Sequence, residues 1–400
     1  MFRIRRFAII AASFAMLVGA ALAVHGQIKR EVFRSNLTDK AGLTAADLGR
    51  LAAGEAVVAA IETNDKQEVA VIGVVRVTSK RSLSIEDLRS SLSPRQNSEV
   101  GAGEQFSTPP RIEDLSRIRL RDDDIEELLK CEVGNCDLNL SESSIWRIRD
   151  AAAQGDGQIK DKLTNIFAQV LFEHLSAYQK AGDSALGDYA NRGRKVVLSD
   201  AHAKLFRDTL FLSETAPSLY EALARFPAGD QSAVASEFFW STVDFGLKPM
   251  ITLSHLSYYP AGPQPSDVLV VATKQIYASR YLDASLTLAL IVAVGDAEKK
   301  EMYLVFTDRS RSDALEGMFG SFTRRVVKTE AVKRVTDIVA TAKARLEQTE
   351  HPAAPDTPEP AADTMLSRAI GWISTPLGIA AVAAAILLLG FILFRRKGVR

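Results

Sequence analysis

The sequence of 400 residues lacks the motifs by which most enzyme active sites are recognised. It contains no Gly-x-Ser-x-Gly elbow, no His-Glu-x-x-His zinc motif and no phosphate-binding loop, and its Gly101-x-Gly103 stands without the rest of a dinucleotide fingerprint. The five histidines are scattered along the chain. His255 has Ser254 and Ser257 beside it, but nothing marks either serine as a nucleophile. We therefore expect a protein that is not an enzyme and that holds no cofactor and no metal ion.

An excess of charge of either sign is missing as well. The chain has 49 basic and 49 acidic residues, so its formal net charge is zero, and no basic block stands out. Proteins that bind nucleic acid usually carry a basic patch, so the composition predicts that nucleic acid is not the partner. The acidic run at 122–127 lacks the alternating ligands and the glycine turn of a calcium loop, and it is typical of a solvated helix N-terminus.

Long apolar segments lie at the two ends of the chain. At the start, three arginines precede an apolar run over residues 7–23, which closes on a small-x-small site ending at Ala23. This is the pattern of a secretory signal peptide over residues 1–23, with an uncleaved anchor as the alternative. Near the other end, residues 374–394 are free of charge and long enough to cross a bilayer as a helix, and a basic tail follows at 395–400.

The flanking basic residues predict the topology of the chain. Basic residues beside a short apolar segment tend to remain in the cytoplasm. Everything between the two apolar segments is then expected outside the cytoplasm, in the periplasm if the source is a Gram-negative bacterium. Residues 24–43 are predicted as an arm, 44–348 as an extracytoplasmic domain and the Pro-rich 349–366 as a linker. The membrane is therefore an expected partner.

Cysteine is scarce, with Cys131 and Cys136 as its two occurrences. Outside the cytoplasm, cysteines this close in sequence favour a disulfide, and Gly134 and Asn135 between them are turn formers. Reduced thiols and a metal site are the alternatives, although zinc needs about four ligands and no second cysteine or histidine pair lies nearby. The short closed loop would add about 2 kcal/mol of stability and would fix the local turn.

The pattern of apolar residues divides the extracytoplasmic domain into three parts. The first holds a short helix from Thr44 to about Leu51, then two strands, a second short helix and a long loop, expected at 56–61, 69–77, 84–92 and 93–111. Thr44 and Ser84 are each followed by an aspartate three residues later, which is a capping-box pattern at the start of each short helix. The second, about 115–245, is expected to be helical because apolar residues recur at every third or fourth position. The third holds four strands and a long helix, expected at 250–258, 268–277, 281–294, 302–306 and 314–347. The apolar stripe of the long helix comprises Phe319, Phe322, Val326, Val335, Ile338, Val339, Ala342 and Leu346.

Several stretches carry a resemblance to a known group of proteins. Residues 129–140, with the core Cys-Glu-Val-Gly-Asn-Cys-Asp, resemble a family of uncharacterised bacterial membrane-anchored proteins that carry a Cys-x-Val-Gly-x-Cys-Asp motif. Residues 236–281 and the Arg-Ser-Arg at 309–311 resemble the same family. The resemblance covers most of the extracytoplasmic region and implies no known activity.

The order of the expected elements is similar to that of START-like helix-grip domains. In that fold an antiparallel sheet wraps a long C-terminal helix, and the resemblance implies a cavity between them. Residues 69–77 and 84–92 would be the opening strand and helix, and the four later strands with the helix 314–347 would complete the grip. The stretch 115–245 would be a large helical insertion, which departs from the usual pattern. The expected fold class is therefore α+β, with an antiparallel sheet on a long helix, this insertion and one C-terminal transmembrane helix.

Two functions from different classes follow from this fold. The first is a membrane-tethered domain that binds a lipid or another apolar ligand in a cavity between sheet and helix. Its candidate polar groups are Lys274, Tyr277, Arg280 and Tyr281. Each of them is equally compatible with a surface position. The alternative is a structural or interaction module for an envelope protein partner, with an interior filled by side chains and no ligand cavity.

Overall fold

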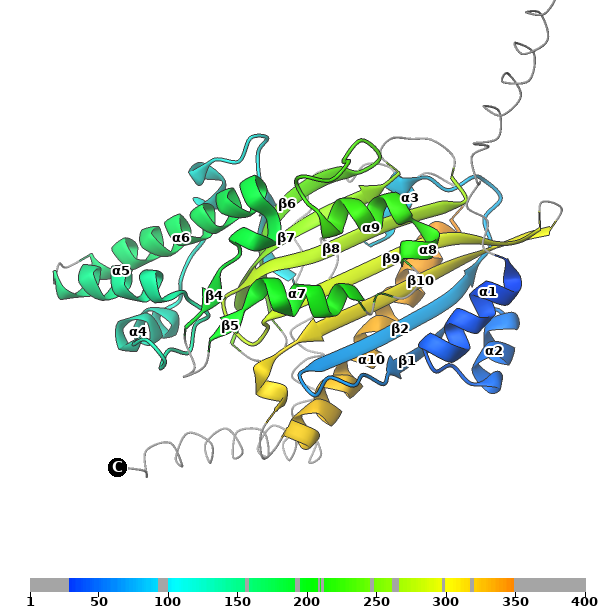
Figure 1. The fold of residues 1–400 in the computed structure, drawn as a ribbon, viewed down its shortest axis with the longest axis horizontal. Coiled ribbons are helices and arrows are strands. Elements are labelled where there is room, and N and C mark those ends of the chain that lie inside the picture. The colour runs from blue at the N-terminus through cyan, green and yellow to red at the C-terminus, as the bar shows by residue number, and fades with distance from the viewer. Residues whose placement is uncertain are drawn as a thin grey trace, which may run out of the picture. The chain divides into compact units, whose positions relative to one another are not determined.

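The structure is a computed structural model that describes residues 29–348 apart from short internal gaps (Figure 1). The gaps are 93–99, 155–157, 191–194, 208, 210–211, 245–247, 261–265, 297–298 and 317–319. The predicted signal segment, Pro-rich linker, membrane helix and basic tail lie outside the described residues. Among the helices that are described, none is both long and apolar enough to cross a membrane.

An antiparallel sheet of eight strands forms the centre of the fold, in the order β1-β2-β10-β9-β8-β7-β6-β3. Its strands are β1 Val57–Ile61, β2 Glu68–Val77, β3 Val100–Gln105, β6 Ala235–Val243, β7 Met250–Tyr259, β8 Val268–Ala278, β9 Ala284–Asp296 and β10 Lys299–Arg311. Strand β10 pairs with β2, so the sheet joins strands that the long insertion separates in sequence. A separate small pair consists of β4 Asp188–Tyr189 and β5 Val196–Val197. The expected α+β class with a large antiparallel sheet is confirmed.

One face of the sheet is covered by α3 Ile85–Ser91 and the long helix α10 Gly320–Leu346 (Figure 1). Helix α10 rests on β2 at Gly73, where an added Cβ would lie 2.7 Å from Val339 Cγ2 and 2.8 Å from Val335 Cγ1. Carbon atoms do not approach so closely, so the absence of a side chain at Gly73 is what permits this contact. Helix and sheet therefore touch directly at this point.

The opposite face of the sheet carries two groups of helices, each with its own apolar cluster. The first group is α1 Arg30–Ser35, α2 Ala45–Ala52, α7 Leu198–Arg207, α8 Leu212–Thr215 and α9 Pro217–Ala224. The second group is α4 Asp122–Lys130, α5 Glu142–Ala153 and α6 Ile159–Ala181, which lies at one end of the sheet (Figure 1). On β8, Ala272 belongs to the first cluster and Ile276 to the second, so a boundary between the clusters crosses this strand.

The strands in the middle of the sheet are apolar almost throughout because both of their faces are buried. Successive side chains of a strand point to opposite faces. On β8, Val270 accordingly packs in the first helical cluster, whereas Val271 packs in the cluster beneath α10. This double burial explains why four strands form where the sequence predicts them, as β7 to β10. The ends of β7 and β8 agree within one residue, whereas β9 begins three residues later than expected and β10 extends from Lys299 to Arg311 instead of 302–306.

Two short helices begin where the sequence predicts capping boxes. Thr44 Oγ1 accepts a hydrogen bond from the Asp47 amide at 3.2 Å, and Asp47 accepts one from the Thr44 amide at 2.9 Å. Ser84 and Asp87 make the same pair of bonds at the start of α3. Burial alone would raise the pKa of Asp87, but its hydrogen bonds to Arg81 and to Ser84 outweigh this and lower the pKa to about 2.

The structure differs from the expected elements at both ends of the helical insertion. The helical region ends with α9, and residues 235–243 form β6, because the aromatic residues Phe238, Phe239 and Trp240 pair well with β7. Strand β3 lies inside the expected loop 93–111. Its Gly-rich sequence has no apolar alternation, and pairing with β6 holds it in place.

The expected arm at 24–43 also differs. Its described part forms α1 and a short π-helix, Asn36–Lys40, because Phe33 and Leu37 are buried in the first apolar cluster. Sequence polarity predicted a linker, but two apolar side chains spaced four residues apart suffice to dock one helical face.

Candidate functional site

Lys274, a predicted ligand-binding residue, lies on β8 at the boundary between the two helical clusters. Its side chain is 0% exposed and forms an ion pair with Asp183, which belongs to the 3-10 turn Gly182–Ala185 after α6. The ammonium lies 5.4 Å from the ring centre of Tyr178 and 5.5 Å from that of Phe206. Aromatic faces attract cations, so one carboxylate and two rings together hold this buried charge.

Two buried histidines lie close to this lysine. His255 on β7 contacts the Tyr178 hydroxyl through Nδ1 at 2.9 Å and the Ser236 hydroxyl through Nε2 at 2.9 Å. His202 on α7 is 1% exposed. Burial, and then the positive charge of Lys274, lower the pKa of His255 to about 3 and that of His202 well below its ordinary value. Both imidazoles are therefore neutral near pH 7.

We call this group the buried seam; it consists of Lys274, Asp183, Tyr178, His202 and His255. Burial lowers the pKa of Lys274, and Asp183 opposes that shift. A lysine of lowered pKa and a Ser–His contact are elements of nucleophilic catalysis. However, the two best-formed pockets of the described residues are lined by other side chains, and a histidine with a pKa of about 3 is a weak base at neutral pH. The buried seam joins the helices to the sheet, and none of its five residues lines either of these two pockets.

Arg280, the second basic candidate, follows β8 and is 3% exposed. Its guanidinium pairs with Asp124, and with Glu127 at 3.1 Å, both on α4. Burial alone would lower the pKa of Arg280, but the two carboxylates raise it. The sequence predicted a solvated acidic start for α4, and this is wrong for Asp124, which is 7% exposed. Its ion pair with Arg280 anchors the helix to the turn after β8.

The two tyrosine candidates have different surroundings. Tyr277 is buried beneath α6, where its hydroxyl donates to the Asn139 carbonyl at 3.0 Å and its ring lies edge-on to Phe167. Tyr281 lies in the turn between β8 and β9 with a φ of 66°, rather than at the start of the expected strand 281–294. None of the four candidates lines either of the two best-formed pockets among the described residues. The structure brings the side chains of Arg280 and Tyr281 into contact, whereas Lys274 pairs with Asp183 and Tyr277 with Asn139.

Two arginines on β10 form buried ion pairs that the sequence did not predict. Arg309 Nη2 lies 2.6 Å from Glu68 Oε1, and the two side chains are 5% and 1% exposed. Arg311 pairs with Asp65 and donates from Nη2 to Gln67 at 2.6 Å. The Arg-Ser-Arg tripeptide was visible in the sequence, but Asp65 is 246 residues away from Arg311, and nothing in the pattern pointed to it.

The predicted cysteine pairing is confirmed: Cys131 and Cys136 form a disulfide with an S–S distance of 1.99 Å. Gly134 between them has a φ of 81°, which favours glycine, and its amide donates to the Ala190 carbonyl at 2.7 Å. The disulfide therefore closes the turn after α4 and holds it beside β4.

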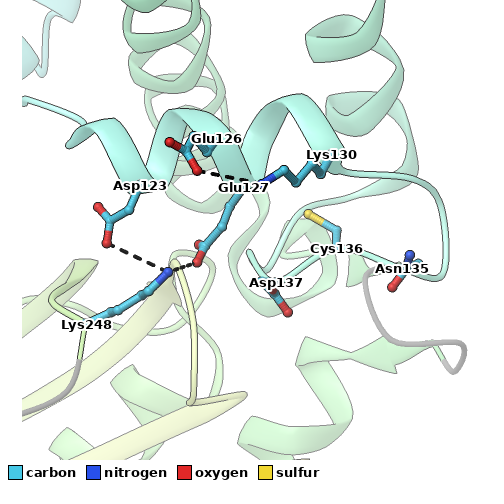
Figure 2. A pocket seen from close by; sticks show the side chains of 8 residues that line it. All are labelled: Asp123, Glu126, Glu127, Lys130, Asn135, Cys136, Asp137 and Lys248. Carbon is cyan, nitrogen blue, oxygen red and sulfur yellow. Dashed lines mark hydrogen bonds and ion pairs between the residues drawn. The ribbon is translucent and has the colours of Figure 1, made fainter. Parts of the chain in front are cut away.

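The larger pocket, of about 310 Å³, lies between α4 and this disulfide loop (Figure 2). Its lining residues are Asp123, Glu126, Glu127, Lys130, Asn135, Cys136, Asp137 and Lys248. Figure 2 shows that Lys248 reaches toward Asp123 and Glu127, while Lys130 pairs with Glu126 at 3.7 Å. Most of its carboxylates are thus already paired, and its polar lining does not suit an apolar ligand.

A second pocket, of about 200 Å³, lies beside β5, α7 and the end of β10. Its charged lining residues are of both signs, and Arg311 among them is already paired with Asp65. In the part of the chain that the structure describes, no group of three or more histidine, cysteine or carboxylate side chains could hold a metal ion.

No protein-family model and no curated protein matches the chain. Among solved structures, it is similar to a protein from Thermus thermophilus, with 13% identity over 28% of this chain and 67% of that chain and a TM-score of 0.21. A likeness this low carries no argument about fold or function.

Proposed function

We propose that the chain is a non-enzymatic, membrane-tethered module whose α+β domain lies outside the cytoplasm and binds a protein partner of the cell envelope. In this proposal the sheet and α10 have a helix-grip-like arrangement without a ligand cavity. The interaction module, the alternative drawn from the sequence, thus replaces the apolar-ligand hypothesis. The observation that carries the proposal is the contact between α10 and Gly73.

The interface between α10 and the sheet supports a filled interior. In a helix-grip domain an apolar ligand would lie between sheet and helix. Here Val335 and Val339 contact β2 so closely that a single added methyl group at Gly73 would clash. Further along α10, Ala342 and Leu346 are 0% and 1% exposed in the same cluster. A ligand pocket for a drug-sized molecule needs roughly 300–1,000 Å³, and these contacts argue against such a space.

The polar candidates support the same proposal. A ligand head group would need polar side chains that are free to bind it. Lys274 is engaged by Asp183, and Arg280 by Asp124 and Glu127. Both side chains therefore form ion pairs within the protein, and these ion pairs hold helices to the sheet.

Exposed apolar side chains on the second helical group and its disulfide loop favour a protein partner. Trp146 on α5 is 49% exposed, Leu129 on α4 is 45% exposed and Val133 in the disulfide loop is 41% exposed. Arg149 stacks over Trp146 at 5.3 Å and lies 3.8 Å from Glu132 of the loop, which links α5 to it. Tryptophan and arginine are enriched where protein interfaces concentrate their binding energy.

The tether rests on the sequence. The apolar segments near both ends carry basic residues on the side that the positive-inside rule assigns to the cytoplasm. The disulfide between Cys131 and Cys136 is consistent with an oxidising compartment. Both features support a domain displayed outside the cytoplasm on a C-terminal anchor.

Native mass spectrometry tests the filled interior. A chain that stops at Thr349 keeps all the helices and strands that the structure describes. It would be secreted through its own leader, purified and incubated with mixed phospholipids. We expect the native and denatured masses to agree. A stoichiometric lipid that survives desalting would contradict the proposal and restore the apolar-ligand hypothesis.

Site-specific photocrosslinking tests the protein partner. A photoreactive phenylalanine analogue would replace Trp146 in the full chain, in its own membrane. The matched control carries the analogue at Val32 of α1, which is 44% exposed. We expect one discrete crosslinked protein with the Trp146 position and not with Val32. Equal or absent crosslinking at both positions would contradict the proposed surface.

A further inference from the structure

The smaller pocket, of about 200 Å³, has no part in the proposed function. It lies where β5 ends and α7 begins, beside the end of β10. A drug-sized molecule needs roughly 300–1,000 Å³, so this pocket suits a smaller ligand. Its charged lining residues are of both signs: Lys195, Lys204, Arg311, Asp200 and Asp283.

The first two turns of α7 present two opposite charges to this pocket. Asp200 and Lys204 are four residues apart, so they share one face of the helix. Both are exposed, and in the part of the chain that the structure describes neither side chain forms a hydrogen bond or an ion pair. An ion pair at this spacing would stabilise the helix. Without it, one charge of each sign remains open to a ligand.

The cationic side of the pocket combines Lys204 with Arg311, whose side chain is 3% exposed. Asp65 engages Nη1 of this arginine and Gln67 engages Nη2, but its buried Nε has no hydrogen-bond partner among the described residues. A buried donor without a partner costs free energy until an acceptor satisfies it. Burial alone would raise the pKa of Asp65, but Arg311 and Lys204 lower it, so the lysine lies near the same arginine.

The remaining lining residues are anionic and apolar. Asp283, just before β9, is 8% exposed and joins Asp200 on the anionic side. Val196 and Ala201 line the same pocket, together with Val197, which is 38% exposed although it is apolar. Burying an exposed valine beneath an alkyl group is favourable. A ligand that carries both charges and a small apolar group would therefore match all three kinds of lining residue.

We infer that this pocket binds a small α-amino acid as a zwitterion, with its carboxylate beside Lys204 and Arg311 and its ammonium beside Asp200. The two charged groups of such a ligand are attached to one carbon atom, so both fit into a pocket of this size. A simple anion would face the carboxylates of the lining, and a simple cation would face its ammonium and guanidinium groups. A zwitterion meets both signs with complementary charges. The inference goes beyond the proposed function and stands whether or not the chain binds a protein partner.

Isothermal titration calorimetry on the full chain in lipid nanodiscs tests the class of ligand. The probes are glycine, L-alanine, L-serine and L-valine, and the matched controls are acetate and ethylamine, which carry one charge each. We expect at least one of the amino acids to bind in a one-to-one ratio. Both controls should bind at least about tenfold more weakly, because each lacks one of the two charged contacts. No binding of any of these amino acids, or acetate binding as tightly as the best of them, would overturn the inference.

Charge-neutral variants test whether the binding occurs in this pocket. Asp200→Asn and Lys204→Gln alter exposed side chains and nearly keep their shapes, so the fold should persist. Each should raise the Kd of the best amino acid by about tenfold or more. The matched controls are Asp150→Asn on α5 and Lys333→Gln on α10, both exposed and outside the pocket lining, and they should leave the Kd unchanged. An unchanged Kd in either pocket variant, or an equal rise in the controls, would also overturn the inference.

Discussion

Gly73 and Val339 are in direct contact across the interface between β2 and α10. A Cβ added at Gly73 would lie 2.7 Å from Val339 Cγ2, with Val335 Cγ1 almost as close. Both contacting methyl groups belong to short, β-branched side chains. Neither can move away unless α10 shifts or the valine changes its rotamer. The position of α10 on the sheet therefore depends on a residue without a side chain.

Replacing Gly73 with alanine should destabilise the protein. Overpacking of a well-packed interior costs about 1–3 kcal/mol, and we expect Gly73→Ala to lower the free energy of unfolding by this amount in urea titrations. The matched control is Gly49→Ala on α2, where an added Cβ meets nothing within 4 Å. That change should be neutral or stabilising by about 0.5–1 kcal/mol, because alanine is the better helix former. Equal effects at both positions would contradict the close contact of α10 with β2.

Local patterns in the sequence predicted the elements whose formation depends on local interactions. The capping boxes at Thr44 and Ser84 satisfy their own amides, and the apolar strands β7 to β10 are buried on both faces. Strand β3 was missed because its place depends on pairing with β6, far away in sequence. The same holds for Phe33, whose core position depends on Tyr303 at a ring distance of 4.8 Å.

The ion pair between Lys274 and Asp183 should respond unequally to removal of its two partners. Lys274 is 0% exposed, whereas Asp183 is 30% exposed and can reach water. Asp183→Asn leaves a buried ammonium without its carboxylate and should cost about 3 kcal/mol or more. Lys274→Met removes the buried charge and should cost clearly less, because the remaining carboxylate can be solvated. Urea unfolding of both variants measures the difference, and a larger loss for Lys274→Met would contradict this account of the buried seam.

The candidate site was only partly visible in the sequence for a physical reason. Lys274 and Arg280 were predicted as ligand-binding residues from their positions in and just after an apolar strand, but the pattern of a strand does not show which elements cover it. Their partners Asp183 and Asp124 lie 91 and 156 residues away and are brought to β8 by helices of the insertion. Which residues a helix delivers to a sheet depends on tertiary packing, so a single sequence could not distinguish a ligand contact from an internal ion pair.

The buried histidines should make folding stability sensitive to acid. The pKa of His255 in the folded protein is about 3, whereas an unfolded histidine has a pKa of about 6.5. As the pH falls below about 6.5 the unfolded chain binds a proton that the folded chain does not, so stability is lost between about pH 6.5 and 3, by up to about 1.4 kcal/mol per pH unit for each such histidine. Urea titrations at several pH values should give a shallower slope for His255→Gln. The control Ser236→Ala retains the histidine and should keep the original slope; an unchanged slope for His255→Gln would contradict the prediction.

Removing the disulfide should loosen the turn between α4 and β4 more than the rest of the protein. The bond between Cys131 and Cys136 closes a short loop, so its chain-entropy contribution is about 2 kcal/mol. The paired change Cys131→Ser with Cys136→Ser should lower the free energy of unfolding by this amount. Hydrogen exchange should accelerate most at the Gly134 amide, which donates to Ala190 across the turn. Reducing agent should reproduce the effect in the unmodified chain and have none on the double variant. A uniform acceleration over the whole sheet would show instead that the disulfide stabilises the fold globally, because the turn would then be part of the same cooperative unit as the strands.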